Sequence, residues 1–203
     1  MINTIIFDFG NVFINLDIPA AIEKTLEKLN VDSIPDEITA FNALYEQGLI
    51  STNEFIDFYL ENFPNLNKTD IVDTWNYMLK DFPEHRLEFL KNLKDKNQYK
   101  LILLSNTNEL HINYIKENVP FYNTFKDCFN AFYLSHEIQL SKPNKDIYNF
   151  VLTENKLKAE NCLFIDDNED NITSAKTLGI KTWHITPYQE DVSTLFETQK
   201  QFF

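Results

Sequence analysis

Basic residues are scarce in this sequence of 203 residues: 18 lysines and arginines face 31 aspartates and glutamates, for a net charge of -13. This deficit argues against nucleic acid or an anionic membrane as the main partner, because both attract basic patches. A local basic site for a small anion remains compatible with it.

Long apolar runs and processing signals are missing as well. No run reaches the roughly 18 residues of a membrane-spanning helix, and no basic start leads into a signal-like apolar segment. The two cysteines, Cys128 and Cys162, lack metal-type spacing, which is typical of buried thiols in a reducing compartment. We therefore expect a soluble, cytoplasmic, monomeric protein without a membrane partner.

Glycine occurs only three times, so each position should have a backbone reason. Gly179 follows a helical pattern and is expected to cap its end. Gly10 lies two residues after Asp8, which itself follows the apolar run 5–7. Such a run predicts a buried parallel strand with Asp8 at its carboxyl end, where open α/β sheets bind ligands. The alternative is an ordinary turn aspartate beside glycine.

Two kinds of pattern divide the chain. Helical periodicity without a convincing strand fills residues 17–83, and it includes capping-box spacing at Ser51 and Glu54. From residue 84 onward, strands and helices alternate, which indicates a doubly wound parallel sheet. We predict a Rossmann-like α/β core over residues 1–16 and 84–203, interrupted by a small α-helical cap over 17–83. The expected strands are 5–7, 100–105, 131–135, 162–166 and 181–185.

Polar residues follow two further predicted strands. Ser105 and Asn106 leave "LILLS", and Asp166 and Asp167 leave "CLFID". Since carboxyl ends of parallel strands share one edge, these residues should converge on Asp8. Adjacent carboxylates repel unless a cation compensates, and Mg²⁺ prefers such oxygen ligands. The alternative is that Asp167 only caps the next helix.

Lys142 precedes Pro143 in the segment "LSKPNKDIY". A lone lysine is usually a solvated surface charge. Beside converging carboxylates, however, an ammonium group can hold a nucleophilic aspartate and a substrate phosphate together.

The segments "DFGNV", "LSNTN", "KP" and "DDNEDN" occur in this order along the chain. Together they resemble the motifs of the haloacid dehalogenase-like hydrolases, most of which are Mg²⁺-dependent phosphatases. The resemblance covers nearly the whole chain, and the helical insert resembles the cap of that family. The longer strings "LSNTNELH" and "FIDDNEDNITSAKTLGI" are similar to the bacterial subgroup that includes α-D-glucose-1-phosphate phosphatase.

The resemblance implies a nucleophile and a metal site. Asp8 would attack phosphorus and form an aspartyl phosphate that water later hydrolyses. Asp8, the main-chain carbonyl of Gly10 and Asp167 would ligate Mg²⁺. Asp166 would orient metal-bound water.

The resemblance also implies a phosphate site for a small phosphorylated metabolite. Ser105 and the backbone of Asn106 would hold phosphate oxygens, and Lys142 would neutralise both Asp8 and the phosphate. Asn171, one turn along the helix from Asp167, would support Lys142.

The sequence departs from most phosphatases of this family at Gly10, where they carry a second aspartate as general acid/base. Losing such a group commonly costs about 10² to 10⁴ in rate. The glucose-1-phosphate phosphatase type looks similar in having glycine there, and an anomeric leaving group needs less protonation. His111 and Asp17 are the side chains that could substitute, although each is more often a surface or cap residue.

Two alternatives to a sugar-phosphate phosphatase stay open. A 2-haloacid dehalogenase would attack carbon, but that reaction needs no metal, and Asp166-Asp167 argues against it. A non-catalytic phosphometabolite-binding protein would have lost turnover with the acid/base residue; the intact Asp8, Lys142 and Asp167 count against it.

Overall fold

The computed structural model describes residues 1–203, and its centre is one sheet of five parallel strands. The spatial order β3-β2-β1-β4-β5 places the first strand in the middle. The predicted parallel sheet is confirmed: two strands have the predicted bounds, and the other three differ by a single residue. The strands are β1 (Thr4–Phe7), β2 (Lys100–Ser105), β3 (Ala131–Leu134), β4 (Cys162–Asp166) and β5 (Lys181–His184).

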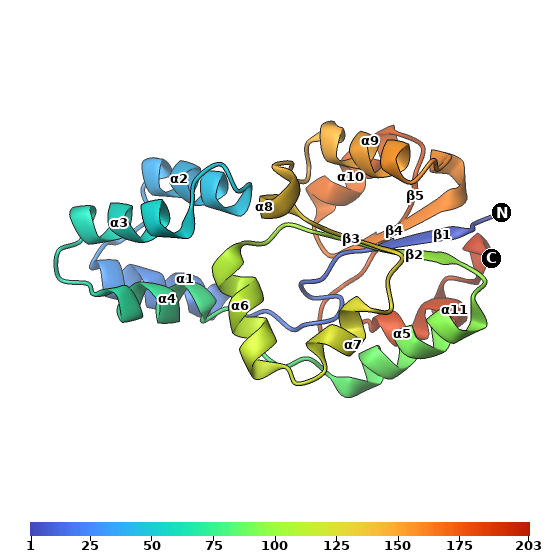
Figure 1. The fold of residues 1–203 in the computed structure, drawn as a ribbon, viewed down its shortest axis with the longest axis horizontal. Coiled ribbons are helices and arrows are strands. Elements are labelled where there is room, and N and C mark those ends of the chain that lie inside the picture. The colour runs from blue at the N-terminus through green and yellow to red at the C-terminus, as the bar shows by residue number, and fades with distance from the viewer.

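Helices cover both faces of this sheet (Figure 1). Because side chains alternate along a strand, Ile5 and Phe7 of β1 join one buried cluster and Ile6 joins the other. The first cluster packs under α5, α6 and α7, and the second under α9 and α10. The helices of this part of the chain are α5 (Glu84–Lys96), α6 (Glu109–Asn118), α7 (Tyr122–Lys126), α8 (Ser135–Ile138), α9 (Lys145–Glu154), α10 (Glu169–Thr177) and α11 (Leu195–Thr198).

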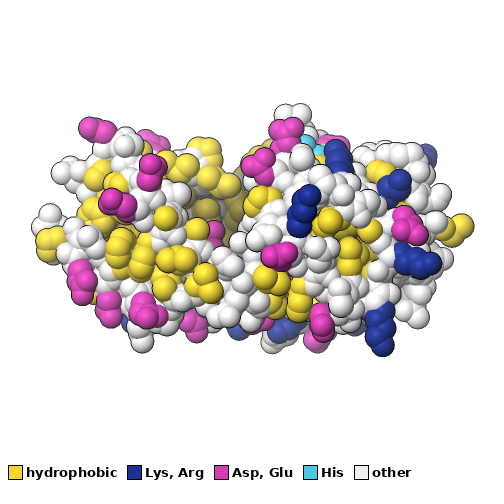
Figure 2. Space-filling view, turned by 90° about the horizontal axis from the view of Figure 1, so that it is seen from above, with side chains coloured by type: hydrophobic (Ala, Val, Ile, Leu, Met, Phe, Trp, Pro, Cys, Tyr) yellow, Lys and Arg dark blue, Asp and Glu magenta, His cyan; other side chains and the backbone are white.

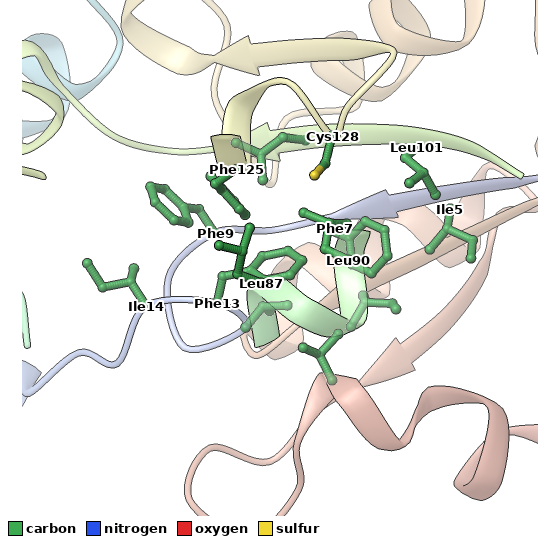
Figure 3. Packing of buried hydrophobic residues seen from close by; sticks show 14 of the residues in the cluster. Ile5, Phe7, Phe9, Phe13, Ile14, Leu87, Leu90, Leu101, Phe125 and Cys128 are labelled. Atoms are coloured by element: carbon green, nitrogen blue, oxygen red, sulfur yellow. The ribbon is translucent and has the colours of Figure 1, made fainter. Parts of the chain in front are cut away.

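Aromatic packing fixes the loop that follows β1. Phe9 and Phe13 point into the larger cluster, where Figure 3 shows them beside Phe7 and Phe125. The ring centroids of Phe13 and Phe125 are 5.0 Å apart, as are those of Phe9 and Phe125. The buried rings of Phe9 and Phe13 therefore fix the position of the short loop 10–12 between them.

Four helices between β1 and α5 form the inserted cap, which lies beyond the edge where the strands end (Figure 1). The predicted capping box is confirmed, since Ser51 N donates to Glu54 Oε2 and Glu54 N donates to Ser51 Oγ. The domain limits at residues 17 and 83 remain a prediction. The cap helices are α1 (Ile18–Leu29), α2 (Asp36–Glu46), α3 (Thr52–Asn62) and α4 (Lys68–Asn76).

The cap has its own aromatic core. Tyr45, Phe55 and Tyr59 are buried, and the rings of Phe41 and Phe58 stack with centroids 3.8 Å apart. These contacts give the cap aromatics a packing role.

Two chain segments join the cap to the sheet, and we call residues 15–17 and 78–80 the linker pair. Leu16 and Leu79 form an antiparallel bridge. Asp17 N donates to Met78 O and Lys80 N donates to Asn15 O, each at 2.9 Å. The two connections thus run side by side. No helix in the structure has the length and apolar character needed to cross a membrane.

Candidate active site

Three carboxylates meet at the carboxyl edge of the sheet. Asp8 follows β1. Asp166 is the last residue of β4, which pairs with β1, and Asp167 follows it. One ligand atom from each carboxylate lies within 4.8 Å of the others. The convergence predicted from the strand ends is therefore present in the structure.

Lys142 lies between two of these carboxylates. Its Nζ is 2.8 Å from Asp8 Oδ1 and 2.7 Å from Asp166 Oδ2, and its side chain is 1% exposed. Burying an ammonium group is unfavourable unless it is paired, so both contacts are needed to hold it there. The lysine is a buried bridge and not a solvated surface charge.

Asn106 positions the main chain of Lys142. Its side-chain Nδ2 donates to Lys142 O at 2.8 Å, and its Oδ1 accepts from Lys142 N at 2.9 Å. This two-way bond ties the segment before α9 to the loop after β2. Sequence reasoning gave Asn106 a backbone role and missed this use of its side chain.

Ser105 is the last residue of β2, next to β1 in the sheet. Its hydroxyl is buried, and its one protein contact is 3.4 Å long, to Asn106 O. The hydroxyl thus keeps hydrogen-bonding capacity for a ligand oxygen.

Asp166 is fully buried, and its carboxylate is satisfied within the protein. Oδ1 accepts from Asn168 N at 2.8 Å, and both oxygens accept from Asn171 Nδ2 at 3.1 Å, in addition to the Lys142 contact. The side chain of Asn171 therefore holds Asp166, whereas the resemblance implied that it supports Lys142. Helical spacing placed Asn171 near the site but could not select its partner.

The charges in this cluster shift one another's pKa values. The pKa of Asp8 is raised to about 7, mainly by burial and also by the charges of Asp166 and Asp167, against the lowering effect of Lys142. Burial disfavours the charge of Lys142, but Asp166 and Asp8 outweigh it and raise its pKa. Three carboxylates around one ammonium group leave an excess of negative charge.

The donor set fits a hard divalent cation. Asp8 Oδ2 accepts no hydrogen bond from the protein, and neither does the carbonyl oxygen of Gly10. With Asp167, these oxygens provide carboxylate and carbonyl ligands of the kind that Mg²⁺ takes.

Asn11 is a contact residue that sequence reasoning missed. Its Nδ2 donates to Asp167 Oδ2 at 2.7 Å, across 156 positions of sequence. The sequence signal was the polar residue after Gly10, which also fits a simple turn.

A cavity of about 140 Å³ lies among the cap helices, and His111 of α6 completes its lining. Apolar side chains dominate its lining, together with Asn42, Glu46 and Thr74, and it includes neither Asp8 nor Lys142. We therefore regard it as a feature of cap packing and not as the phosphate site.

The family model of the haloacid dehalogenase-like hydrolases matches residues 2–179. The chain belongs to this family. It is 34% identical to a haloacid dehalogenase-family enzyme of Bacteroides thetaiotaomicron solved as a magnesium complex, with a TM-score of 0.85 and coverage of 97% of this chain and 99% of that one. A wild-type complex of that enzyme with magnesium and inorganic phosphate gives 32% identity, a TM-score of 0.84 and coverage of 97% and 100%.

A curated relative adds an activity. D-ribitol-5-phosphate phosphatase of Bacteroides thetaiotaomicron is 25% identical over 195 residues, which covers 90% of this chain and 91% of the relative. The predicted family and fold are thereby confirmed.

Gly10 occupies the position at which the resemblance to the family implies a second aspartate. Its φ is not in the left-handed region, so the backbone does not require glycine there. A Cβ at this position would lie 2.7 Å from Leu16 Cδ1, at the end of a flexible side chain. Packing against Leu16 is thus the local obstacle to a side chain.

Neither suggested substitute acid faces the carboxylate cluster. Asp17 caps α1 by accepting from Ala20 N at 3.1 Å. His111 is buried, with Nε2 3.1 Å from Trp75 O and Nδ1 3.1 Å from Asn108 Nδ2. A carbonyl oxygen can only accept, so Nε2 carries the proton. Burial lowers the pKa of His111 to about 4, and the ring stays neutral near pH 7.

Proposed function

We propose that this chain is a Mg²⁺-dependent phosphatase of small phosphorylated metabolites, with Asp8 as the nucleophile. The observation that carries the proposal is the Lys142 bridge between Asp8 and Asp166, beside Asp167. A buried ammonium group that touches a strand-end carboxylate suits an anionic substrate attacked at that carboxylate.

The reaction begins when a carboxylate oxygen of Asp8 attacks phosphorus and the bond to the leaving oxygen breaks. Lys142 holds the attacking carboxylate in place and offsets the charge that builds up on phosphate oxygens. The Ser105 hydroxyl and the main-chain N–H of Asn106 bind those oxygens, since the next N–H, of Thr107, already donates to Ser135 Oγ. A divalent cation held by Asp8, the main-chain carbonyl of Gly10 and Asp167 would supply further positive charge at this site.

Water then attacks phosphorus of the aspartyl phosphate, which releases inorganic phosphate and restores Asp8. Gly10 provides no acid or base for either step, so the leaving oxygen takes its proton from solvent. Leaving groups of low pKa are therefore favoured.

We further propose that the substrates are sugar or sugar-alcohol phosphates. The relative named D-ribitol-5-phosphate phosphatase supports this class. Glucose 1-phosphate is the member that the lack of an acid at Gly10 favours, because its anomeric oxygen leaves readily.

A panel assay tests the proposal. We expect purified protein to release phosphate from at least one of glucose 1-phosphate, D-ribitol 5-phosphate and p-nitrophenyl phosphate with Mg²⁺, and from none in excess EDTA. Full activity in EDTA would overturn the metal role. Chloride release from a 2-haloacid would indicate the dehalogenase alternative. Binding of these esters without turnover would indicate a metabolite-binding protein.

A further inference from the structure

Asn11 lies in the loop after β1 and uses both ends of its side-chain amide. Nδ2 donates to Asp167 Oδ2 at 2.7 Å, and Oδ1 accepts from Leu16 N at 3.0 Å. Asn11 is buried and its two partners are half-buried, so both bonds are partly shielded from solvent. One amide therefore joins a carboxylate of the cluster to the first segment of the linker pair.

The two partners of Asn11 have different surroundings. Asp167 belongs to the carboxylate cluster, and unlike Asp8 and Asp166 it forms no ion pair with Lys142. Leu16 bridges Leu79 in the linker pair. Its carbonyl oxygen accepts a hydrogen bond of 2.6 Å from the hydroxyl of Tyr188. Leu16 is thus tied to the sheet domain on one side and to the returning segment of the cap on the other.

We propose that Asn11 is a positioning residue that holds the Asp167 carboxylate for a divalent cation and couples cation binding to the linker pair of the cap. The proposal rests on the proposed function in requiring a cation at the cluster. It goes beyond that function in assigning the coupling to one side chain.

The hydrogen bond from Asn11 limits the rotational freedom of the Asp167 carboxylate. A carboxylate that must both approach Asp8 and bind a cation benefits from a donor that fixes its rotation, and hydrogen-bond partners of metal ligands typically affect metal affinity by about 10- to 100-fold. Coupling between two sites is reciprocal. If the hydrogen bonds of Asn11 favour cation binding at Asp167, then cation binding also favours those hydrogen bonds, including the one from Leu16 N.

A simpler role for Asn11 is that of a turn residue. Its φ is 55°, a left-handed conformation that asparagine tolerates, and its main-chain N–H donates to Ile14 O at 2.7 Å. The turn accounts for the backbone conformation. It does not require the side chain to reach Asp167 in a distant segment, and the two roles predict different results.

The test uses Asn11→Gly, which keeps the left-handed backbone favourable and removes only the amide. Asn97→Gly is the matched control, because Asn97 ends α5 at a φ of 48°. Titration calorimetry measures the Kd for Mg²⁺ on substrate-free protein. Hydrogen exchange measures how much Mg²⁺ slows exchange of the Leu16 N–H and of residues 78–80.

We expect Asn11→Gly to weaken Mg²⁺ binding by about 10- to 100-fold and to abolish the Mg²⁺-dependent protection of the linker pair. Asn97→Gly should match wild type in both measurements. Asn11→Ser is a second variant, because its hydroxyl can still accept from a nearby N–H but is too short to replace the amide bridge; it should lose Mg²⁺ affinity like the glycine variant.

Two results would overturn the proposal. If Asn11→Gly and Asn11→Ser bind Mg²⁺ within about threefold of wild type, less than the effect expected for a partner of a metal ligand, Asn11 is a turn residue only. If affinity falls while linker protection is unchanged, the coupling is wrong. Wild-type protein that binds no Mg²⁺ would contradict the proposed function as well, which separates the two failures.

Discussion

At the scale of single residues, Asp8 is the side chain on which the chemistry depends. Asp8→Asn keeps the shape of the side chain but cannot form an acyl phosphate, so we expect kcat to fall by at least about 10³-fold. Phosphate release under Mg²⁺ measures this. Asp17→Asn is the control, since Asp17 caps α1 and should affect kcat little. If Asp8→Asn kept more than about a tenth of wild-type kcat, the loss would be far smaller than that expected for a missing nucleophile. Another residue would then be the nucleophile.

Gly10 sets a second test at this scale. Because a Cβ at position 10 would lie 2.7 Å from Leu16 Cδ1, Gly10→Asp should be made together with Leu16→Ala. The added carboxyl can protonate a poor leaving group, so turnover of a primary phosphate should rise by about tenfold or more relative to that of an anomeric phosphate. Leu16→Ala alone is the control. If the folded double variant shows the same ratio of primary to anomeric turnover as the control, another group supplies the proton.

His111 should matter for acid stability and not for proton transfer. Its pKa is lowered to about 4 by burial, below the ordinary value of 6.5. The unfolded chain therefore binds the proton more tightly, and stability falls as pH drops from about 7 toward 4. Between these limits wild type should lose on the order of 2 kcal/mol more than His111→Gln in urea unfolding. Equal losses would show that the pKa of the ring is the same in the folded and unfolded states.

The residues that sequence could assign were those with a strand end in front of them. Asp8, Ser105 and Asp166 each follow or end an apolar strand, so parallel topology alone brought them to one edge. Asn11 and Asn171 could not be assigned correctly, because their partners depend on side-chain direction. The bond of Asn11 to Asp167 spans 156 positions and leaves no local pattern.

At the scale of elements, α5 carries the side chain that fastens the linker to the sheet domain. Arg86 is buried and donates through Nε to Asp191 Oδ2 at 2.9 Å. Nη1 of Arg86 donates to Phe13 O at 3.1 Å and to Asn15 Oδ1 at 2.9 Å. Arg86 and Asp191 thus connect α5, the C-terminal region and the loop that leads to the cap.

Asp191 offers a stability test of this connection. Burial raises its pKa, but hydrogen bonds from Ser193, His85 and Arg86 outweigh burial and hold the pKa well below the usual range. Its stabilisation is therefore present above about pH 4 and is lost as pH falls below that value. Asp191→Asn should lower the free energy of unfolding at neutral pH by roughly 1 to 3 kcal/mol, with a smaller loss in acid. A loss that does not depend on pH would contradict the charge assignment.

Strands and long helices were predictable because their apolar patterns are long enough to show a period. β2 and β4 have the predicted bounds, and β1, β3 and β5 differ from theirs by one residue each. The sequence analysis identified no individual pattern for α7, α8 and α11, which have four or five residues each. Such short helices show no full period, and tertiary packing decides them.

At the scale of the whole molecule, the cap and the sheet domain meet through specific polar contacts. Asn108 Oδ1 accepts from Trp75 Nε1 at 3.1 Å, and His111 donates to Trp75 O. Figure 2 shows a hollow between the two parts on one face. Helical periodicity predicted an insert, but it could not predict which residues dock it, because those contacts join separate patterns.

The missing acid/base at Gly10 gives the whole account a direct consequence. If no side chain activates water for the second step, hydrolysis of the aspartyl phosphate should be slow compared with its formation from a good leaving group. The phosphorylated protein should then accumulate during turnover.

Acid quenching during turnover of p-nitrophenyl phosphate, followed by mass spectrometry of peptides, measures this intermediate. We expect one phosphoryl group on the peptide that contains Asp8, formed with Mg²⁺ and absent both in EDTA and in Asp8→Asn. Two results would contradict an Asp8 nucleophile. One is a phosphoryl group on another residue during Mg²⁺-dependent turnover, and the other is undiminished turnover in Asp8→Asn.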